Sequence, residues 1–261
     1  MHVRVLTFGV SKDWLGAAAA TVELPEGASV VDLLERLRLN LPARLSGHGD
    51  GKGQALRGIA VSVNAEYATA GQVLRDGDEV GLLPPVSGGA ALPGAARTAR
   101  ILDESLGEPT VIALTREPID AEKPVAAAKH GEDGAVVVFD GIVRNNTRGR
   151  QTLHLDYEAY EEMALRQMKE LAELARNKFD VRQVTMIHRL GRLEVGETSV
   201  LIVVASAHRG AAFEACHWLI DTLKKTVPIW KKETFVDGAA WADGEPFPAG
   251  LAVAPEASHE G

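Results

Sequence analysis

Several features that define other protein classes are scarce in this 261-residue chain. Cysteine occurs once, at Cys216, which excludes an internal disulfide framework and a zinc ribbon. The longest apolar runs, such as residues 199–207, fall far short of the roughly 20 residues that a membrane-spanning helix needs. The sequence contains no glycine-rich dinucleotide motif, no Walker loop and no GxSxG motif. The N-terminus enters a strand pattern directly, without a signal peptide, and we expect a cytoplasmic protein that contacts no membrane.

Basic residues are fewer than acidic residues. The 28 lysine and arginine residues face 36 aspartate and glutamate residues, which leaves a formal net charge of −8. Binding to nucleic acid depends on neutralising many phosphates, so this balance argues against a nucleic-acid partner. Any anion site must therefore be a local cluster of basic side chains. The 46% of hydrophobic residues can fill a sizeable core, in one large domain or two small ones.

Residues 1–89 have the pattern of a small mixed domain. Alternating apolar residues predict four strands, and an apolar stripe predicts one helix that Ser29 caps with Asp32 three residues on. The predicted elements are a strand over 3–7, a strand over 20–27, a helix over 29–40, a glycine-rich loop over 43–58, and strands over 59–64 and 76–83. Strand, strand, helix, strand, strand in under ninety residues predicts a ubiquitin-like β-grasp domain that ends at Gly88-Gly89.

A second, larger α/β domain is predicted over 108–250. Residues 90–107 have no clear period and are expected to form a linker, and residues 251–261 are expected to be a flexible tail. The predicted strands cover 110–115, 134–144, 152–160, 183–190, 198–207 and 229–236, and the predicted helices cover 161–178 and 210–226. The first helix should bury Met163, Met168, Leu171, Leu174 and Ala175, and the second should bury Phe213, Cys216, Ile220 and Leu223.

Three segments of the second domain are unusually rich in basic side chains. The first, 141–150, runs from a strand into a loop and contains Arg144. The second, 206–210, joins a strand to a helix, where free backbone N–H groups lie beside His208 and Arg209 and suit a phosphate or carboxylate. The third, 224–233, has two lysine pairs around a proline. Each segment also has a plain structural interpretation: a salt-bridged arginine, a helix cap, and a solvated lysine face.

Within the third segment, Lys224 and Lys231 are the candidates for chemistry. Lys224 lies one helical turn after Ile220, at the edge of the predicted buried face. A lysine beside apolar and cationic groups has a lowered pKa, which makes it a better base, nucleophile or proton donor. Cys216 is expected in the core. His154, His188 and His217 have no ligand spacing, so no metal site is predicted.

Taken together, these segments resemble molybdopterin synthase. Residues 1–89 are similar to its small, sulfur-carrier subunit through 61-VSVNAEY-67, 76-DGDEVGLLPPVSGG-89 and the diglycine. Residues from about 110 to 245 are similar to its large, catalytic subunit, which has an α/β hammerhead-type fold. That similarity rests on four stretches: 133-DGAVVVFDGIVRNNTRG-149, 185-TMIHRLGRLEVGE-197, 205-ASAHRGAAFEAC-216 and 223-LKKTVPIWKKE-233. The chain therefore resembles a carrier fused to its own enzyme.

The resemblance implies sulfur transfer in molybdenum cofactor biosynthesis. In this family the terminal glycine of the carrier, here Gly89, is adenylated by a separate ATP-dependent E1-like enzyme and converted to a thiocarboxylate. Two sulfurs then pass to cyclic pyranopterin monophosphate and form the dithiolene of molybdopterin. No permanently bound cofactor is implied, and the catalytic domain is expected to self-associate, as a dimer or as a heterotetramer after cleavage. Lys224 and Lys231 match the catalytic lysines of the family; Arg144, His208 and Arg209 match its substrate pocket.

One departure from the family pattern concerns Ala90. Small subunits of the family end at the second glycine, whereas here Gly89 is followed by Ala90 and has no free carboxylate. An amide cannot be adenylated as an acid can, so we expect cleavage between Gly89 and Ala90. The competing interpretations are an uncut fusion supplied by a separate carrier, and a non-catalytic ubiquitin-like adaptor or modifier with Gly88-Gly89 as a hinge.

Overall fold

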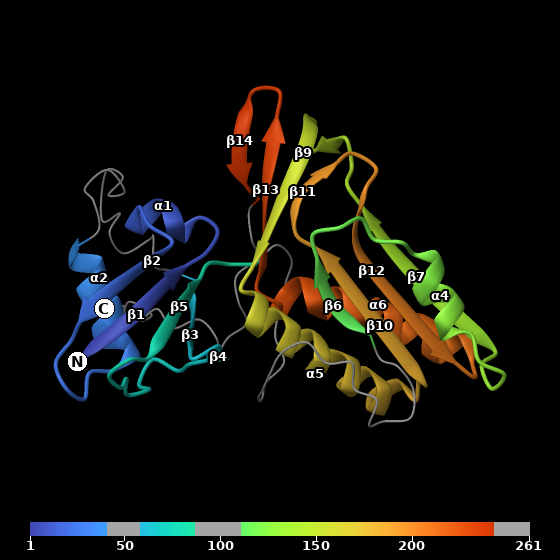
Figure 1. Ribbon diagram of the computed structural model, residues 1–261, viewed down its shortest axis with the longest axis horizontal. Coiled ribbons are helices and arrows are strands. Elements are labelled where there is room, and N and C mark those ends of the chain that lie inside the picture. The colour runs from blue at the N-terminus through green and yellow to red at the C-terminus, as the bar shows by residue number, and fades with distance from the viewer. Residues whose placement is uncertain (41–57, 87–110, 243–261) are drawn as a thin grey trace, which may run out of the picture. The chain divides into compact units, whose positions relative to one another are not determined.

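The computed structural model describes residues 1–40, 58–86 and 111–242 (Figure 1). The first two ranges belong to one compact unit and residues 111–242 to a second. The predicted loop over 43–58 lies almost entirely outside the described residues. The linker over 90–107, the tail over 251–261, Gly88 and Gly89 lie wholly outside them. In the described ranges, no helix is both long enough and apolar enough to cross a membrane.

The N-terminal unit is a β-grasp, as predicted. Its elements are β1 His2–Thr7, α1 Ser11–Leu15, β2 Ala19–Glu23, α2 Val30–Asn40, β3 Ala60–Val63, β4 Glu66–Tyr67 and β5 Glu79–Leu83. The sheet order is β2-β1-β5-β3-β4, and the first and last strands pair in parallel at its centre. The predicted cap begins α2: the Ser29 N–H donates to Asp32 Oδ2 at 2.7 Å, and the Ser29 hydroxyl lies 2.6 Å from the same oxygen.

The second unit contains two sheets and three described helices. Its elements are β6 Ile112–Thr115, α4 Glu122–Ala128, β7 Ala135–Ile142, β8 Asn146–Thr147, β9 Arg150–Ala159, α5 Glu161–Phe179, β10 Gln183–Arg189, β11 Gly191–Glu194, β12 Thr198–Ser206, α6 Arg209–Thr226, β13 Ile229–Phe235 and β14 Gly238–Trp241. One sheet has the order β6-β10-β12-β7, and the other has β11-β9-β13-β14 with β8 paired to β9.

The core of this unit forms on both faces of β12, a central strand (Figure 1). Val200, Ile202 and Val204 pack with buried residues of α5 and α6. The alternate residues Leu201, Val203 and Ala205 pack with Ala128 of α4 on the other face. A strand that is covered on both faces has apolar residues at successive positions. This burial accounts for the apolar run over 199–207, and no membrane span is needed to explain it.

Two residues expected in the core are exposed instead. Phe213 is 63% exposed and Leu174 is 46% exposed. On α6 the buried face is centred on Ala212, Ala215 and Leu219, and successive helical residues are rotated by about 100°, so Phe213 falls at its margin. Within the described ranges, six short elements were not predicted from the sequence: α1, α4, β4, β8, β11 and β14.

Candidate active site

Two lysines are brought together where α6 ends and β13 begins. Lys224 lies in the last turn of α6, which ends at Thr226. The Val227 N–H donates to the Leu223 carbonyl at 3.0 Å and closes that turn, and Pro228 cannot continue the helix. Strand β13 therefore starts at once, at Ile229. The sequence thus folds locally so that Lys224 and Lys231 interact electrostatically across this corner.

Lys231 is held by a buried carboxylate. Its Nζ lies 2.9 Å from Oε1 of Glu233, two residues along the same face of the strand, and the Glu233 side chain is only 4% exposed. The second oxygen, Oε2, is buried and has no hydrogen-bond partner. A buried carboxylate with one free oxygen needs a donor, so Glu233 is a polar group of this site that the sequence patterns did not single out.

The Lys224 side chain is exposed to solvent, but its surroundings disfavour the charged ammonium form. Its surroundings lower the pKa of the Lys224 ammonium, first by partial removal of water and then by the positive charges of Lys231 and Arg144. Asp221, one turn earlier on α6, opposes the shift. The expectation of a lowered pKa is thus confirmed for Lys224, and a lysine of this kind exchanges a proton nearer neutral pH than an ordinary one.

Arg144 contributes a solvent-facing guanidinium to the same cluster. It lies two residues after the end of β7, its side chain is exposed, and its charge acts on Lys224. Among the described residues, it forms neither a hydrogen bond nor an ion pair, so the salt-bridged alternative does not apply there. A free guanidinium beside two lysines is suited to bind a phosphate or carboxylate from solution.

Beneath the lysines lie two aromatic side chains that sequence reasoning did not assign to the site. Tyr157 of β9 pairs with Lys231 across the strands, and its ring meets the His188 ring edge-on with centroids 5.0 Å apart. Burial raises the pKa of Tyr157, against the opposing effect of Lys231. His188 Nδ1 donates to the Arg189 carbonyl at 2.9 Å when that nitrogen carries the proton. The only signal for His188 was its place in the apolar strand 183–190.

His188 should make stability depend on pH. Burial, helped by the Lys224 charge, lowers the pKa of His188 from 6.5 to about 4. The unfolded chain binds a proton between these values and the folded chain does not, so acidification through this window should reduce the free energy of unfolding by about 3 kcal/mol. Urea unfolding at pH 7 and pH 4.5 measures this. His188→Asn should flatten the dependence, whereas His217→Asn, with a side chain 80% exposed, serves as the control.

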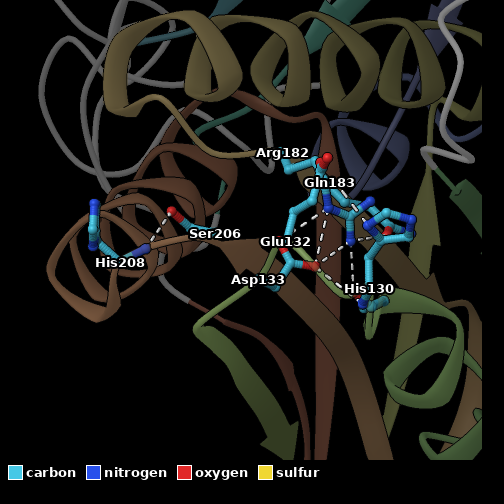
Figure 2. Close-up of polar contacts among 8 residues, drawn as sticks. His130, Glu132, Asp133, Arg182, Gln183, Ser206 and His208 are labelled. Carbon is cyan, nitrogen blue, oxygen red and sulfur yellow. Dashed lines mark hydrogen bonds and ion pairs between the residues drawn. The ribbon is translucent and has the colours of Figure 1, made fainter.

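His208 and Arg209 lie at the other end of α6. His208 is the residue before the helix, with extended φ and ψ, and its N–H donates to Ser206 Oγ at 3.3 Å. Figure 2 shows His208 at the start of the helix, apart from a polar cluster around Arg182. Both side chains are exposed beside the first turn, where the backbone N–H groups and helix dipole favour an anion.

The segment that leads into His208 is held rigidly. The Gly134 N–H donates to the Ser206 carbonyl at 3.1 Å, and a methyl group on Gly134 would collide with the Ala207 carbonyl. The next residue back, Asp133, is buried and accepts two bonds of 3.0 Å from Arg182 Nε (Figure 2). The Arg182 guanidinium lowers the pKa of Asp133. This ion pair braces the strand end before α6.

The predicted site residues therefore form two groups rather than one. Lys224, Lys231 and Arg144 lie together, whereas His208 directly precedes α6, the helix whose last turn contains Lys224. Sixteen residues of helix separate them, a rise of about 24 Å. Within one chain, no single phosphate group can contact both ends. Cys216 is buried as expected, and burial raises the pKa of its thiol to about 11, which leaves it protonated and unreactive.

Comparison with known proteins gives two family matches, one in each of the two compact units. Residues 114–226 match the family described as MoaE protein, and residues 5–89 match the ThiS family. Over 136 residues the chain is 40% identical to the molybdopterin synthase catalytic subunit of Pyrococcus abyssi, covering 51% of this chain and 92% of the relative. The chain belongs to the molybdopterin synthase catalytic subunit family. Membership makes it an enzyme of molybdopterin synthesis, and the ThiS match identifies a sulfur-carrier-type domain at its N-terminus.

A second relative gives the same result. The catalytic subunit from Nostoc sp. is 46% identical over 129 residues, which cover 49% of this chain and 78% of that protein. The solved structure of molybdopterin synthase from Staphylococcus aureus is 37% identical and superimposes with a TM-score of 0.48, over 50% of this chain and 95% of that one.

Proposed function

We propose that this chain transfers two sulfurs, in turn, from a thiocarboxylate on Gly89 to cyclic pyranopterin monophosphate, forming the molybdopterin dithiolene. In this proposal residues 1–89 are the carrier, 108–250 are the catalytic domain, and no permanently bound cofactor takes part. The observation that carries the proposal is the cluster of Lys224, Lys231 and Arg144, in which neighbouring charges and partial desolvation lower the pKa of Lys224.

The cluster suits the chemistry of sulfur transfer. The thiocarboxylate sulfur bonds to the pterin, and water or the Lys224 amine then adds to the acyl carbon. The carbonyl oxygen gains negative charge in this tetrahedral intermediate, and the carbon–sulfur bond breaks as it collapses, which leaves the sulfur on the pterin. An ammonium group stabilises that oxyanion, and a lysine with a lowered pKa also moves protons near neutral pH. We assign Lys224 the acid/base or covalent role. Lys231, fixed by Glu233 at 2.9 Å, holds the thiocarboxylate end or the substrate.

The substrate phosphate requires cationic ligands. Arg144 supplies one beside the lysines, and His208 and Arg209 supply a second group at a helix N-terminus. Because about 24 Å of helix separates the two groups in one chain, a complete site is best assembled from two copies. This arrangement favours self-association through the catalytic domain, with the E1-like activating enzyme as a separate partner of the carrier.

A direct assay tests the function. The catalytic domain, supplied with thiocarboxylated carrier and cyclic pyranopterin monophosphate, should produce the dithiolene, which is detected after oxidation to its fluorescent pterin derivative. Absence of product with both substrates present, under conditions where a characterised relative is active, would refute the proposal and favour the adaptor interpretation.

Mixing two inactive variants tests the two-copy site. Lys224→Ala and Arg209→Ala remove residues from opposite ends of α6, so each should be inactive alone. In a random dimer mixture half of the dimers contain both variants, and one of their two sites is intact. The equimolar mixture, refolded together, should therefore recover about one quarter of the original rate. A mixture as inactive as its components would show that both residues serve one site within a chain.

A further inference from the structure

Arg144 is exposed, but its backbone is clamped on both sides. On one side the Val143 N–H donates to the Glu197 carbonyl at 3.0 Å, and the Val143 carbonyl accepts from the Gly196 N–H at 2.8 Å. On the other side the Asn145 carbonyl accepts from the Thr152 N–H at 3.0 Å. Val143 is 2% exposed and packs with Leu155 and Leu193. A rigid backbone under a free guanidinium is the arrangement expected of a residue organised in advance for an external anion.

The partner of Val143 is a four-residue turn over 194–197. The Glu197 N–H closes it by donating to the Glu194 carbonyl at 3.1 Å. Gly196, at its third position, has φ of +90°, a conformation that favours glycine. The carboxylate of Glu197 returns across the turn, and its Oε2 accepts the Glu194 N–H at 2.7 Å. The turn that clamps Val143 is thus tied together by one acidic side chain.

Arg189 fixes that carboxylate from the end of β10. Its Nη1 lies 3.1 Å from Glu197 Oε1, and the arginine side chain is 10% exposed. The Glu194 N–H and the Arg189 guanidinium both lower the pKa of Glu197, which remains charged. Ion pairs in such partly buried places hold a defined geometry better than surface pairs do. The Arg189 carbonyl also accepts from His188 Nδ1. This bond connects the Arg189–Glu197 ion pair to the aromatic side chains next to the two lysines.

We infer that Glu197 and Arg189 are positioning residues that hold Arg144 where the phosphate of the substrate binds. The inference rests on the proposed function, because it takes Arg144 as a phosphate ligand. Neither residue touches the substrate. Loss of their ion pair frees the backbone around Arg144, so the guanidinium must be ordered again each time the phosphate binds, and binding weakens while the chemistry at Lys224 continues.

The test is a double-mutant cycle on the full chain, with cleaved and thiocarboxylated carrier supplied. Glu197→Ala should raise the KM for cyclic pyranopterin monophosphate about 3- to 10-fold, the factor expected for ordering one long side chain. Its kcat should stay within about 2-fold, since the lysines are untouched. In an Arg144→Ala background the same substitution should raise KM no further, because the residue that it positions is gone. If Glu197→Ala does not fold, Glu197→Gln and Arg189→Lys are measured in its place, because each keeps a side chain of similar size.

The matched control is Glu194→Gln in the same turn. Its side chain makes an exposed ion pair with Arg192 at 2.7 Å and does not contact the clamp, so KM should remain unchanged. The inference is overturned if Glu197→Ala raises KM equally in both backgrounds, lowers kcat alone, or leaves KM unchanged while Arg144→Ala raises it. If Arg144→Ala itself leaves KM unchanged, the phosphate role of Arg144 fails and the inference falls with it. Failure of the original chain to form dithiolene refutes the proposed function instead.

Discussion

Lys224→Ala is expected to abolish dithiolene formation, with kcat reduced by at least about 10²- to 10⁴-fold, the usual contribution of a general acid or base. The residue lies in the last turn of α6 and reaches solvent, so its truncation removes little packing and the fold should persist. The reason for the loss is electrostatic as well as acid–base. Partial desolvation and the charges of Lys231 and Arg144 lower the pKa of this ammonium, so its removal takes away both a positive charge and a group that exchanges protons nearer neutral pH. Single-turnover assays with excess enzyme measure the chemical step directly.

Two companion variants sharpen the interpretation of Lys224. Lys232→Ala removes an exposed lysine of β13 that lies over the Trp241 ring, 5.8 Å from its centroid, and should leave the rate unchanged. Lys224→Arg keeps the positive charge but cannot release a proton at physiological pH. Loss of activity in that variant assigns Lys224 to proton transfer or covalent catalysis, whereas retention assigns it to oxyanion stabilisation alone. Normal turnover by Lys224→Ala would refute any catalytic role.

Periodicity predicted the main elements of both units well. Alternation located β1 and β3, the continuous apolar run over 199–207 located β12, and the Ser29–Asp32 pattern located the start of α2, because these signals are local. The shorter elements were missed for a physical reason. A segment such as β11, Gly191–Glu194, is short and has a single buried apolar side chain, Leu193, which is too little to show an alternating pattern. Pairing with β9 makes it a strand.

The candidate site, too, was only partly predictable from local sequence patterns. Lys224, Lys231 and Arg144 were chosen for residue type, position and above all their match to the family pattern, and the structure places them together. Glu233, Tyr157 and His188 could not be assigned to the site, because their proximity depends on strand register rather than on any local pattern. The separation of His208 from Lys224 is different. It was already implied by one predicted helix over 210–226, whose rise per residue of about 1.5 Å places its ends far apart.

Processing at Gly89 should decide whether the carrier works at all. Adenylation joins a carboxylate oxygen to the α-phosphorus of ATP and releases pyrophosphate, and the Gly89–Ala90 amide has no such oxygen. The uncut chain should therefore show no ATP–pyrophosphate exchange with the E1-like enzyme, whereas the same residues ending at a free Gly89 should be fully competent. In the native cell we expect two products, a carrier ending at Gly89 and a catalytic part beginning at Ala90. Intact-mass analysis of the active enzyme measures this. If active preparations contain only the 27.8 kDa species, cleavage is excluded and sulfur must come from a separate carrier.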